Sequence, residues 1–102
     1  MTLPGGVTSG IPIYTPVVGT GADQAALAAN NLRRGLLFHN PSATVVFYLM
    51  PQPLTGSVAA ALNTGIQMPV GSTVIIDDLF CTCAWRVISS AAGGSLTCLE
   101  WQ

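Results

Sequence analysis

The final third of the chain, Gly65 to Trp101, alternates short runs of apolar and β-branched residues with glycine turns. Two alternating runs, Thr82 to Ser89 and Ser95 to Trp101, flank the sequence Ala-Ala-Gly-Gly at positions 91–94. The two glycines supply the positive φ angles that a tight chain reversal needs. The pattern therefore predicts that the chain closes on a β-hairpin of two antiparallel strands.

Pairing this hairpin with Trp85 opposite Leu99 assigns its side chains to two faces. Arg86 is then diagonal to Glu100 and able to form an ion pair with it. Neither face is wholly polar, so we expect one to form the core and the other to be covered. The predicted core face consists of Cys83, Trp85, Val87, Leu99 and Trp101, and the reverse face of Arg86, Ile88, Leu96, Cys98 and Glu100.

The middle of the chain shows the same alternation. Residues 35–40 and 43–50 are predicted as strands of another hairpin, joined by the turn Asn40-Pro41-Ser42. Residues 43–50 are apolar on both faces, which is typical of a strand between two layers or at a subunit contact. Shorter strands are predicted at 65–68 and 72–77, separated by a turn at Pro69-Val70-Gly71.

Several short strands bounded by turns predict an all-β fold. We expect a small antiparallel β-sandwich, jelly-roll-like, or a barrel, with an extended N-terminal arm at residues 1–21 and the β-sandwich domain at 22–102. Residues 22–31 are prone to form a short helical turn or an irregular loop. Residues 51–64 are predicted as a long connection that could hold one helical turn at 58–62 and reach over a neighbour.

The predicted arm is rich in glycine and proline. Pro12 and Pro16 exclude a helix and confine any strand there to the edge of a sheet. Its apolar residues are too numerous to be left in water, so we expect the arm to pack on its own domain or on a neighbour. The predicted interface residues of the arm are Ile11, Ile13, Tyr14, Val17 and Val18.

The composition favours burial in an assembly. Only 7% of the 102 residues are charged and there is no lysine, against about 25% charged residues in a typical soluble domain. A free monomer of this kind would expose large neutral patches and self-associate; the alternative is a neutral surface rich in Ser, Thr and Asn.

The composition also excludes several classes of partner. A net charge of −1 argues against nucleic-acid binding. No apolar run has the roughly 18–20 residues of a membrane span. The N-terminal sequence lacks the features of a signal peptide, so we expect synthesis in the cytoplasm without export.

Candidate chemistry is sparse. Cys81-x-Cys83 with His39 and Cys98 is the one set with metal-ligand chemistry, but it lacks the doubled cysteine pairs of structural zinc sites. The three cysteines are expected to be small buried side chains. His39 is expected to be a hydrogen-bonded turn residue, and the adjacent acids at 77–78 to end a strand, because neighbours on a strand point to opposite faces. We therefore predict no enzyme, no cofactor, no metal and no small-molecule substrate.

Arg33 and Arg34 precede the first strong strand and are further interface candidates. A guanidinium group keeps its charge and binds carboxylates bidentately, so the pair could form a salt bridge to an acidic residue of a neighbour. The alternative is a solvated pair at the beginning of a strand.

Three stretches carry a resemblance to a known group of proteins. They read LRRGLLFHNPSATVVFY at 32–48, GIQMPVGSTVIID at 65–77 and AWRVISSAAGGSLTCLEW at 84–101. Together they cover about two-thirds of the chain. This order resembles small β-sandwich structural proteins of tailed bacteriophages, which include capsid decoration (cement) proteins and head-fibre proteins. One departure is Val70, which separates a proline and a glycine that are usually adjacent in the pattern.

The resemblance implies a structural virion protein. The first expectation is a capsid decoration protein on the capsid surface, partnered by the major capsid protein or other virion proteins and forming a homo-oligomer, with a trimer as one option. The alternatives are a head-fibre base, neck or tail component, or, from another class, a small carbohydrate-binding module.

Overall fold

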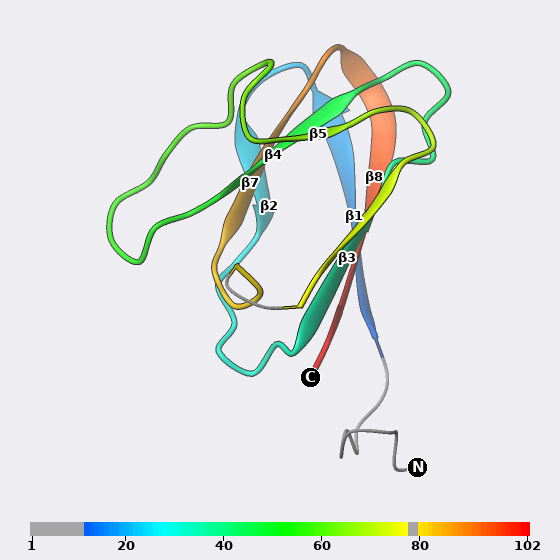
Figure 1. The fold of residues 1–102 in the computed structure, drawn as a ribbon. Coiled ribbons are helices and arrows are strands. Elements are labelled where there is room, and N and C mark those ends of the chain that lie inside the picture. The colour runs from blue at the N-terminus through cyan, green and yellow to red at the C-terminus, as the bar shows by residue number, and fades with distance from the viewer. Residues whose placement is uncertain (1–11, 78–79) are drawn as a thin grey trace.

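The computed structural model describes residues 12–77 and 80–102 of the chain. This part holds eight strands and no helix (Figure 1). The strands are β1 Ile13–Thr20, β2 Gln24–Leu27, β3 Gly35–His39, β4 Phe47–Pro51, β5 Ile66–Met68, β6 Thr73–Ile76, β7 Trp85–Ser89 and β8 Ala92–Trp101.

The strands form two four-stranded sheets in which all neighbours are antiparallel. Sheet A has the order β1-β8-β3-β6, and sheet B has the order β2-β7-β4-β5. Successive strands change sheet, except β4 and β5, which pair directly. This is the strand order of a jelly roll, which contains two Greek keys. The predicted all-β antiparallel sandwich is confirmed.

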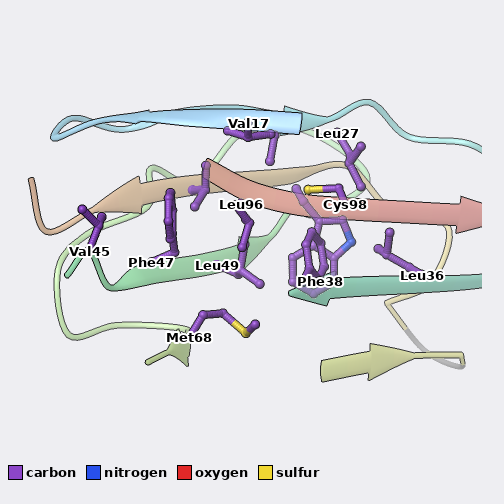
Figure 2. Packing of buried hydrophobic residues seen from close by; sticks show 13 residues of the cluster. Val17, Leu27, Leu36, Phe38, Val45, Phe47, Leu49, Met68, Leu96 and Cys98 are labelled. Carbon is purple, nitrogen blue, oxygen red and sulfur yellow. The ribbon is translucent and has the colours of Figure 1, made fainter. Parts of the chain in front are cut away.

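The core lies between the two sheets, and Figure 2 shows side chains from both pointing toward one another. At its centre Trp85 and Phe38 pack edge to face, with ring centroids 5.0 Å apart. The indole Nε1 of Trp85 donates to the carbonyl of Phe80 (3.2 Å), so the largest core residue has no unsatisfied polar atom. The other buried residues of this core cluster are Val17, Ala26, Leu27, Leu36, Val45, Phe47, Leu49, Met68, Val87, Leu96 and Cys98.

The predicted hairpin of residues 35–50 is wrong, because its two strands are β3 and β4 of opposite sheets. The buried side-chain amide of Asn40 holds the crossing by donating to the carbonyls of Val45 and Met68, both at 2.8 Å. The crossing places the apolar residues of the two strands on opposite sides of one core. A hairpin would have placed them side by side in a single sheet.

The predicted closing hairpin is also wrong. Strand β7 belongs to sheet B and β8 to sheet A, where β8 pairs with β1 and β3. Gly93 and Gly94 do have positive φ angles of 90° and 68°. They lie near the start of β8, where the register with β1 shifts. A bulge of this kind bends the strand locally rather than reversing it.

The core face of β8 is the opposite of the predicted one. Leu96 and Cys98 are fully buried, whereas Leu99 and Trp101 lie on the outer face and are partly buried. On β7 the prediction is confirmed, since Trp85 is buried with the rest of its face. Because β8 is apolar on both faces, hydrophobicity alone could not distinguish the two registers.

Residues 22–31, predicted as a helical turn or a loop, contain strand β2. It pairs with β7, and its Ala26 and Leu27 are buried in the core. Tertiary packing thus overrides the helix propensity of the alanines. The long connection is present as predicted, without the helical turn considered at residues 58–62.

Strand β1 lies at the edge of sheet A, as its prolines predict. It pairs with β8 from Ile13 to Thr20. Residues 13–20 of the predicted arm are therefore part of the sandwich. Residues 1–11, with the predicted interface residue Ile11, lie outside the described residues.

Candidate functional site

The residues considered for metal chemistry are not brought together. His39 lies on the outer face of β3, with its Nδ1 3.1 Å from the Ser72 carbonyl and 2.8 Å from Thr73 Oγ1. Cys98 is in the core, and the thiol of Cys83 donates to the carbonyl of Phe80 (3.2 Å). Among residues 12–77 and 80–102, no group of three or more His, Cys, Asp or Glu side chains could hold a metal ion.

Cys98 is a packed core side chain. It is fully buried, and burial raises the pKa of its thiol to about 12, with a further contribution from the negative charge of Glu100 and a partial offset from Arg33. The thiolate is the reactive form of cysteine. Cys98 is therefore protonated and unreactive at neutral pH.

Arg33 is a buried structural residue, which corrects its prediction as an interface residue. Its side chain is 1% exposed and forms an ion pair between Nε and Glu100 Oε2 of the same chain. Its other nitrogens donate to the carbonyls of Cys81 and Cys83, both at 3.0 Å, and of Ala28 at 2.7 Å. One guanidinium group thereby joins three segments to the last strand. We call Arg33, Glu100 and these three carbonyls the Arg33 cluster.

The predicted interface residues on β1 divide between the two faces of the strand. Val17 points inward and is buried, so it belongs to the core. Ile13, Tyr14 and Val18 are 45%, 56% and 61% exposed, which is high for apolar side chains. Arg34 is exposed next to the start of β3.

The outer face of sheet A carries a continuous apolar row. Tyr14 is level with Leu99, Leu99 with Leu37, and Leu37 with Ile75, so the row crosses all four strands. Each of the four residues alternates with inward-pointing neighbours and therefore points away from the core. Ile75, at the end of the row, is 59% exposed. We call Tyr14, Leu99, Leu37 and Ile75 the outer row.

Beside the outer row the face stays uncharged. The next row along the strands is Pro16, Thr97, His39 and Thr73. Toward the chain terminus, Trp101 lies against Gly35, where an added Cβ would come within 2.0 Å of the indole ring. None of the outward-pointing positions of the four strands holds Asp, Glu, Lys or Arg.

The outer face of sheet B differs because the chain covers it. Tyr48 points outward from β4 but is buried, and its hydroxyl donates to Asn63 Oδ1 (3.3 Å) in the connection between β4 and β5. Ala60 of the same connection is buried, and its amide donates to Asp23 Oδ1 (2.9 Å). Within the described residues, the connection therefore covers the part of sheet B around Tyr48, whereas Tyr14 and Ile75 on the outer face of sheet A stay more than half exposed.

The charged side chains of the described residues lie off the outward-pointing positions of the sheet A strands. Arg86 on sheet B binds Asp23 through both carboxylate oxygens, at 2.8–3.1 Å. This hydrogen bonding lowers the pKa of Asp23 below its ordinary value, against a smaller opposing effect of desolvation. Arg34 and Asp77 are exposed beyond the ends of β3 and β6, at the rim of the outer face of sheet A. Asp78, the other acid of the predicted pair, lies outside the described residues.

A groove of about 840 Å³ runs beside edge strand β2. Residues 25–29 form one side and residues 52–57 the other, with residues 82–86 between them. Small side chains predominate in its lining, and its larger apolar residues include Leu27, Leu54 and Phe80. The charge of Arg86, the one charged residue of the lining, is matched by Asp23. Its other polar side chains, Asn31, Gln52, Ser57 and Thr82, are uncharged, so the groove is largely apolar and electrically neutral.

The tryptophans do not form a sugar platform. Carbohydrate binding requires an aromatic ring with a free face, yet Trp85 is fully buried and Trp101 is partly buried against Gly35. The groove lining includes the amide side chain of Gln52, which is occupied by hydrogen bonds to Val58 (2.7 and 2.8 Å). The exposed aromatic rings of the described residues are instead Tyr14 on the outer row and Phe80 at the groove, 56% and 43% exposed.

Two features were missed by sequence reasoning. The outer row depends on the register of β8, which its two-sided hydrophobicity did not determine. The Arg33 cluster joins residues far apart in the chain, and no local pattern marks it. Its one available signal was the scarcity of charge, since each ionic side chain in such a sequence is expected to have a specific partner.

No family model, curated protein or solved structure matches this chain. In the part of the chain that the structure describes, there is also no helix of the length and apolarity needed to span a membrane.

Proposed function

We propose that this protein is a structural component of a tailed-bacteriophage virion, a capsid decoration protein that docks through the outer face of sheet A. The observation that carries the proposal is the outer row of Tyr14, Leu99, Leu37 and Ile75, which crosses all four strands of sheet A without a charged side chain and whose two end residues are more than half exposed among the described residues. The largest exposed apolar patch of a protein is often functional, and many such patches are protein interaction sites.

The size of the face indicates the kind of contact that it makes. Four strands about 4.8 Å apart and five residues long present roughly 300 Å², well below the approximately 800 Å² per partner of a standard stable interface. A single copy would bind weakly through this face alone. A homo-oligomer would add avidity, because linked copies bind a symmetric capsid surface at several points.

The architecture agrees with this role without establishing it. Jelly rolls occur in viral capsid domains as well as in lectins and cupins, and a fold by itself does not define a function. The resemblance of residues 32–48, 65–77 and 84–101 to phage structural proteins adds the identity of the expected partner, the major capsid protein.

The test is co-sedimentation with capsids of the encoding phage that lack this protein. We expect saturable binding by the wild type and a loss of at least tenfold in affinity for Ile75→Asp, because the variant places an unpaired charge in the contact. Leu62→Asp is the matched control, since Leu62 is 49% exposed on the loop side, and it should bind normally.

Two results would overturn the proposal. A soluble wild-type protein that fails to bind these capsids is not a decoration protein. Saturable binding to isolated tails or necks, with none to capsids, would assign it to another part of the virion.

A further inference from the structure

The groove beside β2 lacks the features of a small-molecule site. Its volume of about 840 Å³ is within the range of such sites, but these use a few convergent polar groups to orient the ligand. Here Arg86 is occupied by Asp23 and Gln52 by the backbone of Val58. No buried side-chain nitrogen or oxygen of the described residues lacks a hydrogen-bond partner. The other polar side chains of the lining, Asn31, Ser57 and Thr82, are uncharged and could bind a peptide backbone. The groove therefore fits an uncharged, largely apolar chain segment.

Residues 1–11 have the chemistry of such a segment. Their sequence, MTLPGGVTSGI, contains no charged side chain, and Pro4 with three glycines disfavours a helix. In an extended conformation Leu3, Val7 and Ile11 share one face, because side chains alternate along an extended chain. Extended peptides are commonly recognised in this way, with alternate side chains on one side of the peptide entering the groove of the recipient protein.

The position of strand β1 places this segment at the correct end of the sandwich. Ile13 is level with Glu100, and Glu100 is joined through Arg33 to the carbonyls of Ala28 and Cys83, two residues that line the groove. The start of β1 therefore lies at the end of the sandwich where Ala28 and Cys83 line the groove.

The segment is long enough to bind in the groove of a neighbouring copy. Pro12 disfavours the helical conformation for the residue before it and favours an extended one. Fully extended, the residues 1–11 reach about 36 Å, comparable to the 40 Å long dimension of the sandwich. About five of these residues suffice to lie along residues 25–29.

We propose that residues 1–11 of one copy bind in the β2 groove of the next, linking copies of this chain through exchanged N-terminal segments. The link concerns contacts between copies of this protein and does not depend on the capsid partner. It can therefore be tested with purified protein alone, and its failure would leave capsid binding through sheet A untouched.

The test compares the full chain with a variant lacking residues 2–11 by sedimentation equilibrium. We expect concentration-dependent association of the full chain and a monomer for the truncated chain. Val7→Asp should weaken association roughly tenfold or more, because it removes a buried apolar contact. Thr8→Asp is the matched control: it adds the same charge on the opposite face and should associate normally.

The groove side is tested with Ala29→Asp, which places a charge in the lining, against Ala43→Asp, an exposed position outside it. Only Ala29→Asp should lose association, with both variants keeping the wild-type melting temperature.

A synthetic peptide of residues 1–11 added to the truncated chain should shift the backbone amide resonances of residues 25–29. Equal masses for the full and truncated chains, or peptide-induced shifts confined to sheet A, would overturn the proposal. So would a monomeric full chain whose residues 25–29 respond to truncation, because the segment would then occupy its own groove.

Discussion

Replacing Arg33 by methionine removes the centre of the Arg33 cluster. Its side chain is 1% exposed, so Met fills similar space while the charge and every donor are lost. Glu100, 12% exposed, would be left without its cationic partner, and the carbonyls of Ala28, Cys81 and Cys83 without their donor. Breaking a buried ion pair by removing one partner costs about 3–5 kcal/mol. That is a large part of the roughly 5–15 kcal/mol that stabilises a typical domain.

The assay is urea unfolding followed by tryptophan fluorescence. With an m-value of about 1.5 kcal/mol/M, the expected loss lowers the urea midpoint by roughly 2–3 M. Adding Glu100→Met to Arg33→Met should restore about 1–3 kcal/mol, because the buried carboxylate no longer lacks a partner, while the three carbonyls remain unsatisfied.

Arg86→Met is the matched control for this prediction. Arg86 also pairs with a carboxylate, but its side chain is 31% exposed and solvent screens the pair. We expect a clearly smaller loss than for Arg33→Met. An Arg33→Met protein within 1 kcal/mol of the wild type would refute the structural role of the cluster.

Three further predictions concern single sites. Gly35→Ala brings a Cβ within 2.0 Å of the Trp101 ring. We expect the indole to be displaced and the free energy of unfolding to fall by about 1–3 kcal/mol. Unchanged Trp101 fluorescence and melting temperature would contradict this packing. Cys98, with a thiol pKa of about 12, should resist iodoacetamide at pH 8 until the protein unfolds, as read by mass spectrometry; equal labelling of native and urea-unfolded protein would disprove its burial. Hydrogen bonding to Arg86 lowers the pKa of Asp23 below 3.8 in the folded state. The pair therefore stabilises the fold above pH 3.8, and this stabilisation is lost as the pH falls through the folded-state pKa of Asp23. As the pH is lowered from 5 to 2, the urea midpoint of Asp23→Asn should therefore fall less than that of the wild type. Equal falls in the two midpoints would show that the pair contributes nothing to stability.

The fold class was accessible from the sequence because it depends on local signals. Alternating runs, turn residues and the prolines of β1 identify most strands and place β1 at a sheet edge. Strand pairing was not accessible, since alternation indicates which residues share a face but not which strand lies alongside. The short connections after β3 and β7 therefore resembled hairpins, although each crosses to the other sheet.

The candidate site was predicted in part. The exposed positions Tyr14 and Val18 of β1 follow from its apolar sequence, whereas Leu99 was assigned to the core because β8 is apolar on both faces. Arg33 was expected at a surface, and the structure buries it against Glu100. Such a long-range ion pair depends on the fold and leaves no local pattern in the sequence.

The most direct measurement of the central claim is hydroxyl-radical footprinting of the protein bound to capsids, compared with the free protein. Docking through the outer face of sheet A predicts that Tyr14 and Ile75 lose reactivity on binding, while Leu62 on the opposite face is labelled equally in both states. Protection of Leu62 with Tyr14 and Ile75 still reactive would show that the protein docks through sheet B, and would contradict the account.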